Sequence, residues 1–199
     1  LCHALVPIAI LWVAWALLLF RLGALSLWID EWFTASVART PWERIMEHIV
    51  ATERRPPLHY VLLKLWIILS GDSEYAMRLF SAMLAVLSVV ALYALGRRLF
   101  SRRVGLVAAL WLAISPFFIL YGRMVRAYSL AMLLGTLATW AFVRAVERPT
   151  FGRWVIYGSA ALAFLYTDYS GLAVLGAHAL YVLVGRLANR RPPMAWLVT

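Results

Sequence analysis

Cysteine and acidic residues are scarce in this chain, which has one cysteine and nine Asp and Glu among its 199 residues. The single Cys2 cannot form an internal disulfide, and no Cys or His cluster has the spacing of a structural metal site. Charged residues make up only 14% of the chain, whereas an ordinary soluble domain has about a quarter. The composition therefore excludes both a disulfide-stapled domain and an ordinary soluble one.

Hydrophobic residues, in contrast, make up 64% of the chain, and its mean hydropathy is +0.82. This composition is typical of a membrane protein. The formal net charge of +10 could suggest nucleic acid as a partner. However, the 19 Lys and Arg are spread through apolar segments and form no continuous basic face. We therefore predict an integral membrane protein whose surroundings are the lipid bilayer and which binds no nucleic acid.

The apolar segments predict several membrane spans, because a bilayer core about 30 Å thick needs about 20 helical residues. Segments of suitable length are residues 4–25, 75–96, 104–121, 129–146 and 154–187. The sequence TDYSG at 167–171 divides the last of these into spans near 153–167 and 171–186, and a further apolar stretch begins at 194. The predicted fold class is all-α, a polytopic helical membrane protein with interfacial helices in its first outer loop.

One apolar segment, residues 58–70, is too short to cross, since 13 residues make only about 20 Å of helix. It also carries Lys64 in its middle, so we expect it to lie at the interface or to re-enter without crossing. Residues 26–74 then form one outer loop. The links near 97–103, 144–153 and 186–191 share the opposite face and hold ten arginines. Short Arg-rich links favour the cytoplasm, which predicts that the outer loop is extracytoplasmic.

The outer loop contains its own helix signal. Thr40-Pro41-Trp42-Glu43 reads as an N-cap, a proline at the first helical position and a capping-box glutamate. Apolar residues then recur at helical spacing up to Val50, which predicts an amphipathic helix that ends before the Pro-Pro pair at 56–57.

The acidic pair Asp30 and Glu31 is the first candidate for chemistry. Neighbouring side chains on a helix point about 100° apart, so the two are poorly placed to flank one bond as an acid/base pair. One carboxylate as a base, with the other held by hydrogen bonds or a metal, fits better. A solvated loop in which the two acids cap whatever follows is the alternative interpretation.

Further polar groups lie near the ends of the predicted spans. Arg55 and His59 bracket the Pro-Pro turn, and Arg123 and Arg126 lie in an outer turn between two spans. Arginines so close to hydrocarbon are costly unless paired, although their side chains can also reach the headgroups. Asp168 lies in a short turn, where it is either a functional acid or a helix cap.

Taken in order, these groups resemble the first half of a polytopic glycosyltransferase of the C-type fold, related to family 39. The matching elements are Asp30-Glu31, Pro56-Pro57-Leu58-His59-Tyr60, Gly96 to Arg103, Ser115-Pro116, Arg126-Ala127-Tyr128 and Tyr166 to Gly171. The branch includes protein O-mannosyltransferases, the lipid A aminoarabinose transferase and related bacterial lipopolysaccharide transferases. The resemblance covers nearly all of residues 1–199, so we expect the N-terminal part of a transferase domain that is truncated at both ends.

The resemblance implies an enzyme of the plasma (inner) membrane that moves a sugar from a polyprenyl-phosphate donor to a glycan, lipid or protein acceptor on the extracytoplasmic face. The resemblance implies no definite cofactor, and it is compatible with a divalent metal in the site. By matching positions, Asp30 is the base and Glu31 its neighbour, while Arg126, Arg55 and Arg123 are candidates to hold the donor phosphate. Attack opposite the leaving group predicts inversion at the anomeric carbon.

The motifs also differ from those of relatives at two places. Many relatives carry Gln-Glu before the Ala-Arg of the second outer turn, whereas this chain has Arg123-Met124-Val125-Arg126 and lacks the second acid. Relatives also often carry His at the place of Asp168. Asp168 is therefore a candidate to supply the missing carboxylate, and His59 and Tyr128 of the matching motifs are further candidate site residues. A transporter or lipid-linked-sugar flippase is the main alternative function, and a non-catalytic membrane scaffold is another. The transporter is disfavoured because the chain has no inverted repeat and its polar residues cluster towards the outer surface.

Overall fold

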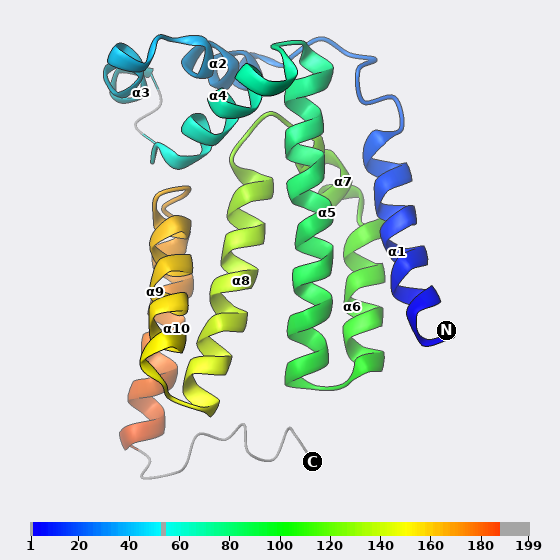
Figure 1. The fold of residues 1–199 in the computed structure, drawn as a ribbon, viewed down its shortest axis with the longest axis vertical. Helices are drawn as coiled ribbons and strands as arrows, with labels where there is room; N and C mark the ends of the chain where they lie inside the picture. Colours follow the sequence, from blue (N-terminus) through cyan, green and yellow to red (C-terminus); the bar gives the residue numbers. More distant parts are fainter. Residues whose placement is uncertain (1, 53–54, 188–199) are drawn as a thin grey trace.

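The computed structural model describes residues 2–52 and 55–187, and over these residues the fold is all-helical, as predicted (Figure 1). The longer helices run side by side along one axis: α1 (Cys2–Leu19), α5 (Glu74–Leu99), α6 (Arg102–Ile114), α8 (Tyr128–Glu147), α9 (Phe151–Leu165) and α10 (Gly171–Leu187). Shorter elements gather near one end: α2 (Ile29–Arg39), the 3-10 helix η1 (Trp42–Arg44), α3 (Ile45–Thr52), α4 (Leu58–Ser70) and α7 (Pro116–Arg123). The apolar stretch from 194 lies outside the described residues.

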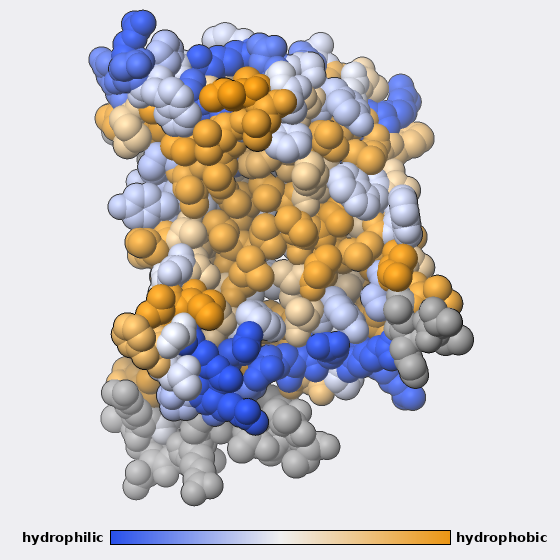
Figure 2. Space-filling model, viewed as in Figure 1, coloured by the Kyte–Doolittle hydropathy of each residue, from blue (hydrophilic) through white to orange (hydrophobic). Residues whose placement is uncertain are grey.

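The helices differ in their ability to cross a membrane. Within the described residues, α5 and α8 are long and apolar enough to do so, and α6 with α7 would make a third, broken span. The other long helices, α1, α9 and α10, are apolar but shorter. A broad apolar band covers the middle of the face seen in Figure 2, with hydrophilic side chains at both ends. The fold is that of a polytopic helical membrane protein.

Two predicted spans needed correction. The segment 4–25 ends as a helix at Leu19, because the backbone after it turns away and its carbonyl groups bond to a distant arginine. The segment 104–121 is not one helix but two, bent by 64° between Ile114 and Pro116. Proline lacks a backbone N–H and disfavours helix in the residue before it, and Ser115 is accordingly extended.

The outer loop is more helical than predicted. A helical segment over 42–52 is confirmed as η1 and α3, and the helix over 58–70 is confirmed as α4. The predicted capping box is wrong, because Thr40 ends α2 and its hydroxyl donates to the Ser36 carbonyl oxygen. Helix α2, which carries the acidic pair, was not predicted.

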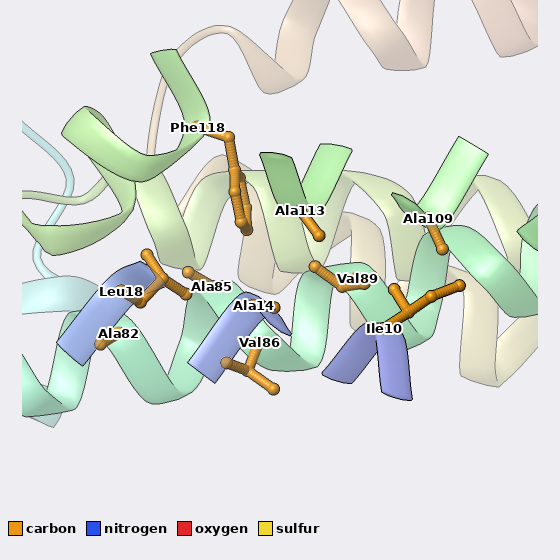
Figure 3. Close-up of a cluster of buried hydrophobic side chains, with 10 residues drawn as sticks. All are labelled: Ile10, Ala14, Leu18, Ala82, Ala85, Val86, Val89, Ala109, Ala113 and Phe118. Carbon is orange, nitrogen blue, oxygen red and sulfur yellow. The ribbon is translucent and has the colours of Figure 1, made fainter. Parts of the chain in front are cut away.

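Small side chains hold the long helices together. One cluster of buried residues joins α1, α5, α6 and α7, and half of its ten members are alanine (Figure 3). A second cluster packs α2 and α4 against the first turn of α5: Ala35, Ala38, Leu63, Met77 and Val125. Small residues let helix backbones approach closely, which is the main way to gain packing energy in a membrane. The second cluster also anchors α2 beside the link between α7 and α8.

The closest helix approach predicts a stability effect. A Cβ atom added at Gly105 of α6 would lie 2.8 Å from both the Arg97 backbone nitrogen and the Tyr93 carbonyl oxygen of α5. These backbone atoms cannot move aside, so Gly105→Ala is expected to lower the free energy of unfolding by about 1–3 kcal/mol. Thermal unfolding in one detergent checks this, with Gly158→Ala as control because nothing lies within 4 Å of that Cβ position. Equal melting temperatures for the two variants would contradict the packing argument.

Candidate active site

Asp30 and Glu31 share the first turn of α2 but have opposite surroundings. The Glu31 residue is 1% exposed, whereas Asp30 is exposed. Adjacent positions on a helix point about 100° apart, so one side chain enters the protein while the other leaves it. The acidic pair therefore consists of two independent groups.

The Glu31 carboxylate is saturated with hydrogen bonds. Its Oε2 accepts from the Trp28 backbone N–H at 3.0 Å and from Arg78 Nη2 at 2.7 Å. Its Oε1 accepts from Arg78 Nε at 3.1 Å and from the Val125 backbone N–H at 2.9 Å. Burial raises the pKa of Glu31, but the bonds from Arg78, Val125 and Trp28 outweigh it, so the pKa lies below its ordinary value. Glu31 is an ionised structural anchor with no acceptor position left for a substrate proton.

Arg78, near the start of α5, is the ion-pair partner of Glu31 and was not among the predicted site residues. It is buried, and besides the two bonds to Glu31 it donates to the carbonyl oxygens of Leu22, Leu25 and Ser26. All five N–H groups of the guanidinium are thereby used. The pair fixes the α1–α2 loop, the start of α2 and the α7–α8 link to one point. An arginine inside an apolar helix is costly unless it is paired, and that signal could have identified Arg78.

Arg126 is packed against α2 and does not face solvent. It is buried, and its Nη1 donates to the Asp30 carbonyl oxygen at 3.0 Å and to Thr34 Oγ1 at 3.1 Å. These bonds fix the backbone of Asp30, whereas its carboxylate accepts no hydrogen bond from Arg126. Arg126 thus fixes the helix turn that carries the candidate base.

His59 of α4 is buried among aromatic rings, with ring centroids 6.0 Å from Tyr60 and 6.2 Å from Phe80. Neither ring nitrogen has a hydrogen-bond partner among the described residues. Burial, together with the nearby positive charge of Arg126, lowers the pKa of His59 to about 3. His59 is therefore neutral at physiological pH.

This buried histidine predicts acid sensitivity. Between its ordinary pKa of 6.5 and about 3, the unfolded chain binds a proton at His59 that the folded chain does not. Stability contributed by this group is full above pH 6.5 and falls by about 1.4 kcal/mol per pH unit as the pH drops through that window. His59→Leu should therefore flatten the dependence of melting temperature on pH between 6.5 and 5, where Glu31 stays ionised. Parallel curves for wild type and variant would contradict the assignment.

A pocket of about 440 Å³ opens beside the acidic pair, between the end of α1, the start of α2, α7 and the start of α8. Its lining residues are Arg21, Leu22, Leu25, Trp28, Asp30, Glu31, Arg78, Leu120, Tyr121, Arg123, Met124 and Tyr128. Among the described residues, the Asp30 carboxylate and the Arg123 guanidinium make no hydrogen bond or ion pair. The pocket thus places a free carboxylate and unpaired arginine side chains beside apolar walls.

The candidate residues fall into two groups. Asp30, Glu31, Arg123 and Tyr128 line the pocket, and the Tyr128 ring packs edge-on against Tyr121 with centroids 5.2 Å apart. The remaining candidates do not line it: Arg126, Arg55, His59 and Asp168.

The turn that carries Asp168 meets the start of α4 instead of the pocket. The Leu58 backbone N–H donates to the Tyr166 carbonyl oxygen at 2.9 Å. Asp168 Oδ1 accepts from the Ser170 backbone N–H at 2.8 Å, a local turn in the link before α10. Within the described residues, no group of three or more His, Cys, Asp or Glu side chains is placed so that it could hold a metal ion.

Comparison with known proteins assigns the chain to a family. The family model described as dolichyl-phosphate-mannose-protein mannosyltransferase matches residues 54–199, nearly three quarters of the chain. The chain belongs to this family. It is a membrane glycosyltransferase, and the resemblance inferred from the sequence motifs is confirmed. The search of curated proteins and the search of solved structures found no match. The matched range begins after Asp30 and Glu31, so their roles depend on the geometry of the pocket.

Proposed function

We propose that this glycosyltransferase moves a sugar from a polyprenyl-phosphate donor to an acceptor hydroxyl, with Asp30 as general base and Arg123 as a ligand of the donor phosphate. The observation that carries the proposal is the pocket, where the carboxylate of Asp30 and the guanidinium of Arg123 share one apolar space and neither has another partner among the described residues. A guanidinium suits phosphate, and a carboxylate suits the abstraction of a hydroxyl proton.

The proposed reaction is a single displacement. The acceptor oxygen attacks the anomeric carbon while its proton passes to the Asp30 carboxylate. The bond between the anomeric carbon and the phosphate oxygen breaks, and both electrons leave with the phosphate. The leaving group needs no proton, because Arg123 can stabilise its growing negative charge. Attack and departure on opposite faces of the sugar invert the anomeric configuration.

The other residues act by position. Glu31 and Arg126 hold the turn of α2 that carries Asp30, and the bond from the Val125 N–H to Glu31 ties the segment after Arg123 to the same turn. Arg55, which lies outside the pocket, has no role in this step. The walls contributed by Leu25, Trp28 and Leu120 suit the prenyl chain of the donor.

The proposed membrane orientation puts the pocket on the extracytoplasmic face of the plasma (inner) membrane. The elements that line the pocket, among them the start of α2 and the end of α7, lie towards the end of the bundle opposite the short links α5–α6 and α8–α9 (Figure 1). Those links and the helix turns beside them carry Arg97, Arg98, Arg102, Arg103 and Arg148, as the cytoplasmic side of a membrane protein does. Nucleotide sugars stay in the cytoplasm, so an outward-facing site requires a lipid-borne donor.

Transfer by the full-length protein in lipid nanodiscs tests the function. Mannosyl, other hexosyl and pentosyl polyprenyl phosphates would be supplied with a glycan, lipid or peptide acceptor, and the anomeric configuration of the product would be determined by NMR. One donor is expected to give an inverted product. Retention of configuration would contradict the single displacement, and movement of the lipid-linked sugar across a liposome without transfer would favour the flippase.

A further inference from the structure

Arg21 occupies an unusual backbone position beside the pocket. Its φ is 54°, and it is the one non-glycine residue with positive φ in the part of the chain that the structure describes. It follows the end of α1 at Leu19, a place where helices often turn through a left-handed residue. That residue is usually glycine, because a Cβ atom disfavours the conformation. The position therefore favours glycine, whereas the chain has arginine.

The neighbouring loop keeps Arg21 in place. Arg78 bonds to the carbonyl oxygens of Leu22, Leu25 and Ser26, so the chain just after Arg21 is fixed to the buried Glu31 pair. Arg21 lines the same pocket as Asp30 and Arg123. Among the described residues its guanidinium makes no hydrogen bond or ion pair, so no internal contact explains an arginine here. An unfavourable backbone conformation at the edge of a pocket indicates a functional constraint.

The reaction itself calls for a second cation. A sugar polyprenyl phosphate is a phosphodiester with one negative charge. Once the sugar leaves, polyprenyl phosphate is a monoester that carries about −1.5 to −2 charges at pH 7. The single positive charge of Arg123 balances the single negative charge of the donor, whereas the departing phosphate needs a second positive group. Interactions that strengthen as the charge grows speed the chemical step more than they tighten donor binding.

We propose that Arg21 is a second phosphate-binding residue of the pocket, and that together with Arg123 it holds the polyprenyl phosphate that departs during transfer. This assignment rests on the proposed function. It makes the pocket selective for a lipid phosphate monoester over the neutral or singly charged lipids of the bilayer. Arg21 then contributes more to the turnover rate than to the Michaelis constant for the donor.

Arg21→Gly is the sharpest test, because the conformation favours glycine while the charge is lost. In the full-length protein in nanodiscs, binding of undecaprenyl phosphate is expected to weaken at least tenfold, with an unchanged or higher melting temperature. Arg21→Asn repeats the test with another residue that tolerates positive φ, and Arg21→Lys should retain much of the binding. The matched control is Arg148→Gly, which removes one exposed arginine at the opposite end of the bundle.

The outcomes separate this proposal from the function on which it rests. Undiminished binding of undecaprenyl phosphate by both Arg21→Gly and Arg21→Asn would overturn the role of Arg21 and leave the proposed function intact. If the wild-type protein bound undecaprenyl phosphate no better than a neutral prenyl alcohol, the proposed function would fail and the role of Arg21 with it. Equal loss in Arg148→Gly would show a general charge effect and would also overturn the assignment.

Discussion

Asp30→Asn is expected to reduce sugar transfer by about 10²–10⁴-fold, the usual contribution of a general base. The asparagine keeps the shape of the side chain but cannot accept the proton of the acceptor hydroxyl. Because Asp30 is exposed and its carboxylate makes no internal bond among the described residues, folding should be unaffected. Turnover of the best donor, measured at saturating acceptor, checks the rate, and the melting temperature checks the fold.

Donor binding separates a base from a binding residue. Undecaprenyl phosphate should bind Asp30→Asn at least as tightly as wild type, because removing a nearby negative charge does not weaken the binding of an anion. Glu47→Gln is the matched control, since Glu47 is an exposed acid on α3 that lies outside the pocket. Normal turnover by Asp30→Asn would show that the exposed carboxylate is not the base.

The spans could be predicted from sequence because they depend on local composition. The predicted helix at 58–70 has the same bounds as α4, and the segment 75–96 lies within α5. The errors arose where a distant group decides the outcome. The first span ends early because Arg78 bonds to the carbonyl groups that follow it, and hydropathy cannot show that contact. The break at Pro116, in contrast, had a local signal that the apolar composition of the segment outweighed.

The helix α2 shows how a weak signal is lost. Its first turn contains two acids and its last turn contains Arg39, the charge order that favours a helix. Exposed aromatic residues such as Trp28 and Trp32 obscured the helical pattern of apolar residues. Their exposure suits contact with a membrane interface, whereas the usual helix signal is one apolar face buried in the protein. The signal was present but did not stand out.

The site was predictable only in part. Helix geometry alone indicated that Asp30 and Glu31 point in different directions, and the structure agrees. Which of them is buried depends on partners 47 and 94 residues away in the chain, Arg78 and Val125. The same limit applies to Arg123 and Arg126, which the sequence presents as equivalent. Only the packing of α2 makes one of them a pocket residue and the other an internal support.

Glu31→Gln is expected to lower the free energy of unfolding by about 3–5 kcal/mol, because it leaves the Arg78 charge buried without its counter-ion. Glutamine has one acceptor oxygen in place of two, so its amide nitrogen would face N–H donors of Arg78 or Val125. Thermal and denaturant unfolding in detergent would measure the loss. Asp30→Asn is the matched control because it changes the adjacent acid, and it should be nearly neutral for stability.

A double-mutant cycle with Arg78→Met tests whether the two charges act as one unit. Arg78→Met alone leaves the Glu31 carboxylate buried and removes the donors to Leu22, Leu25 and Ser26. If the pair is the anchor, the double variant should lose less stability than the sum of the two single losses, since neither charge remains unpaired. Additive losses would mean that Glu31 and Arg78 stabilise the fold separately. In that case the loop that carries Arg21 and the turn that carries Asp30 would be held independently.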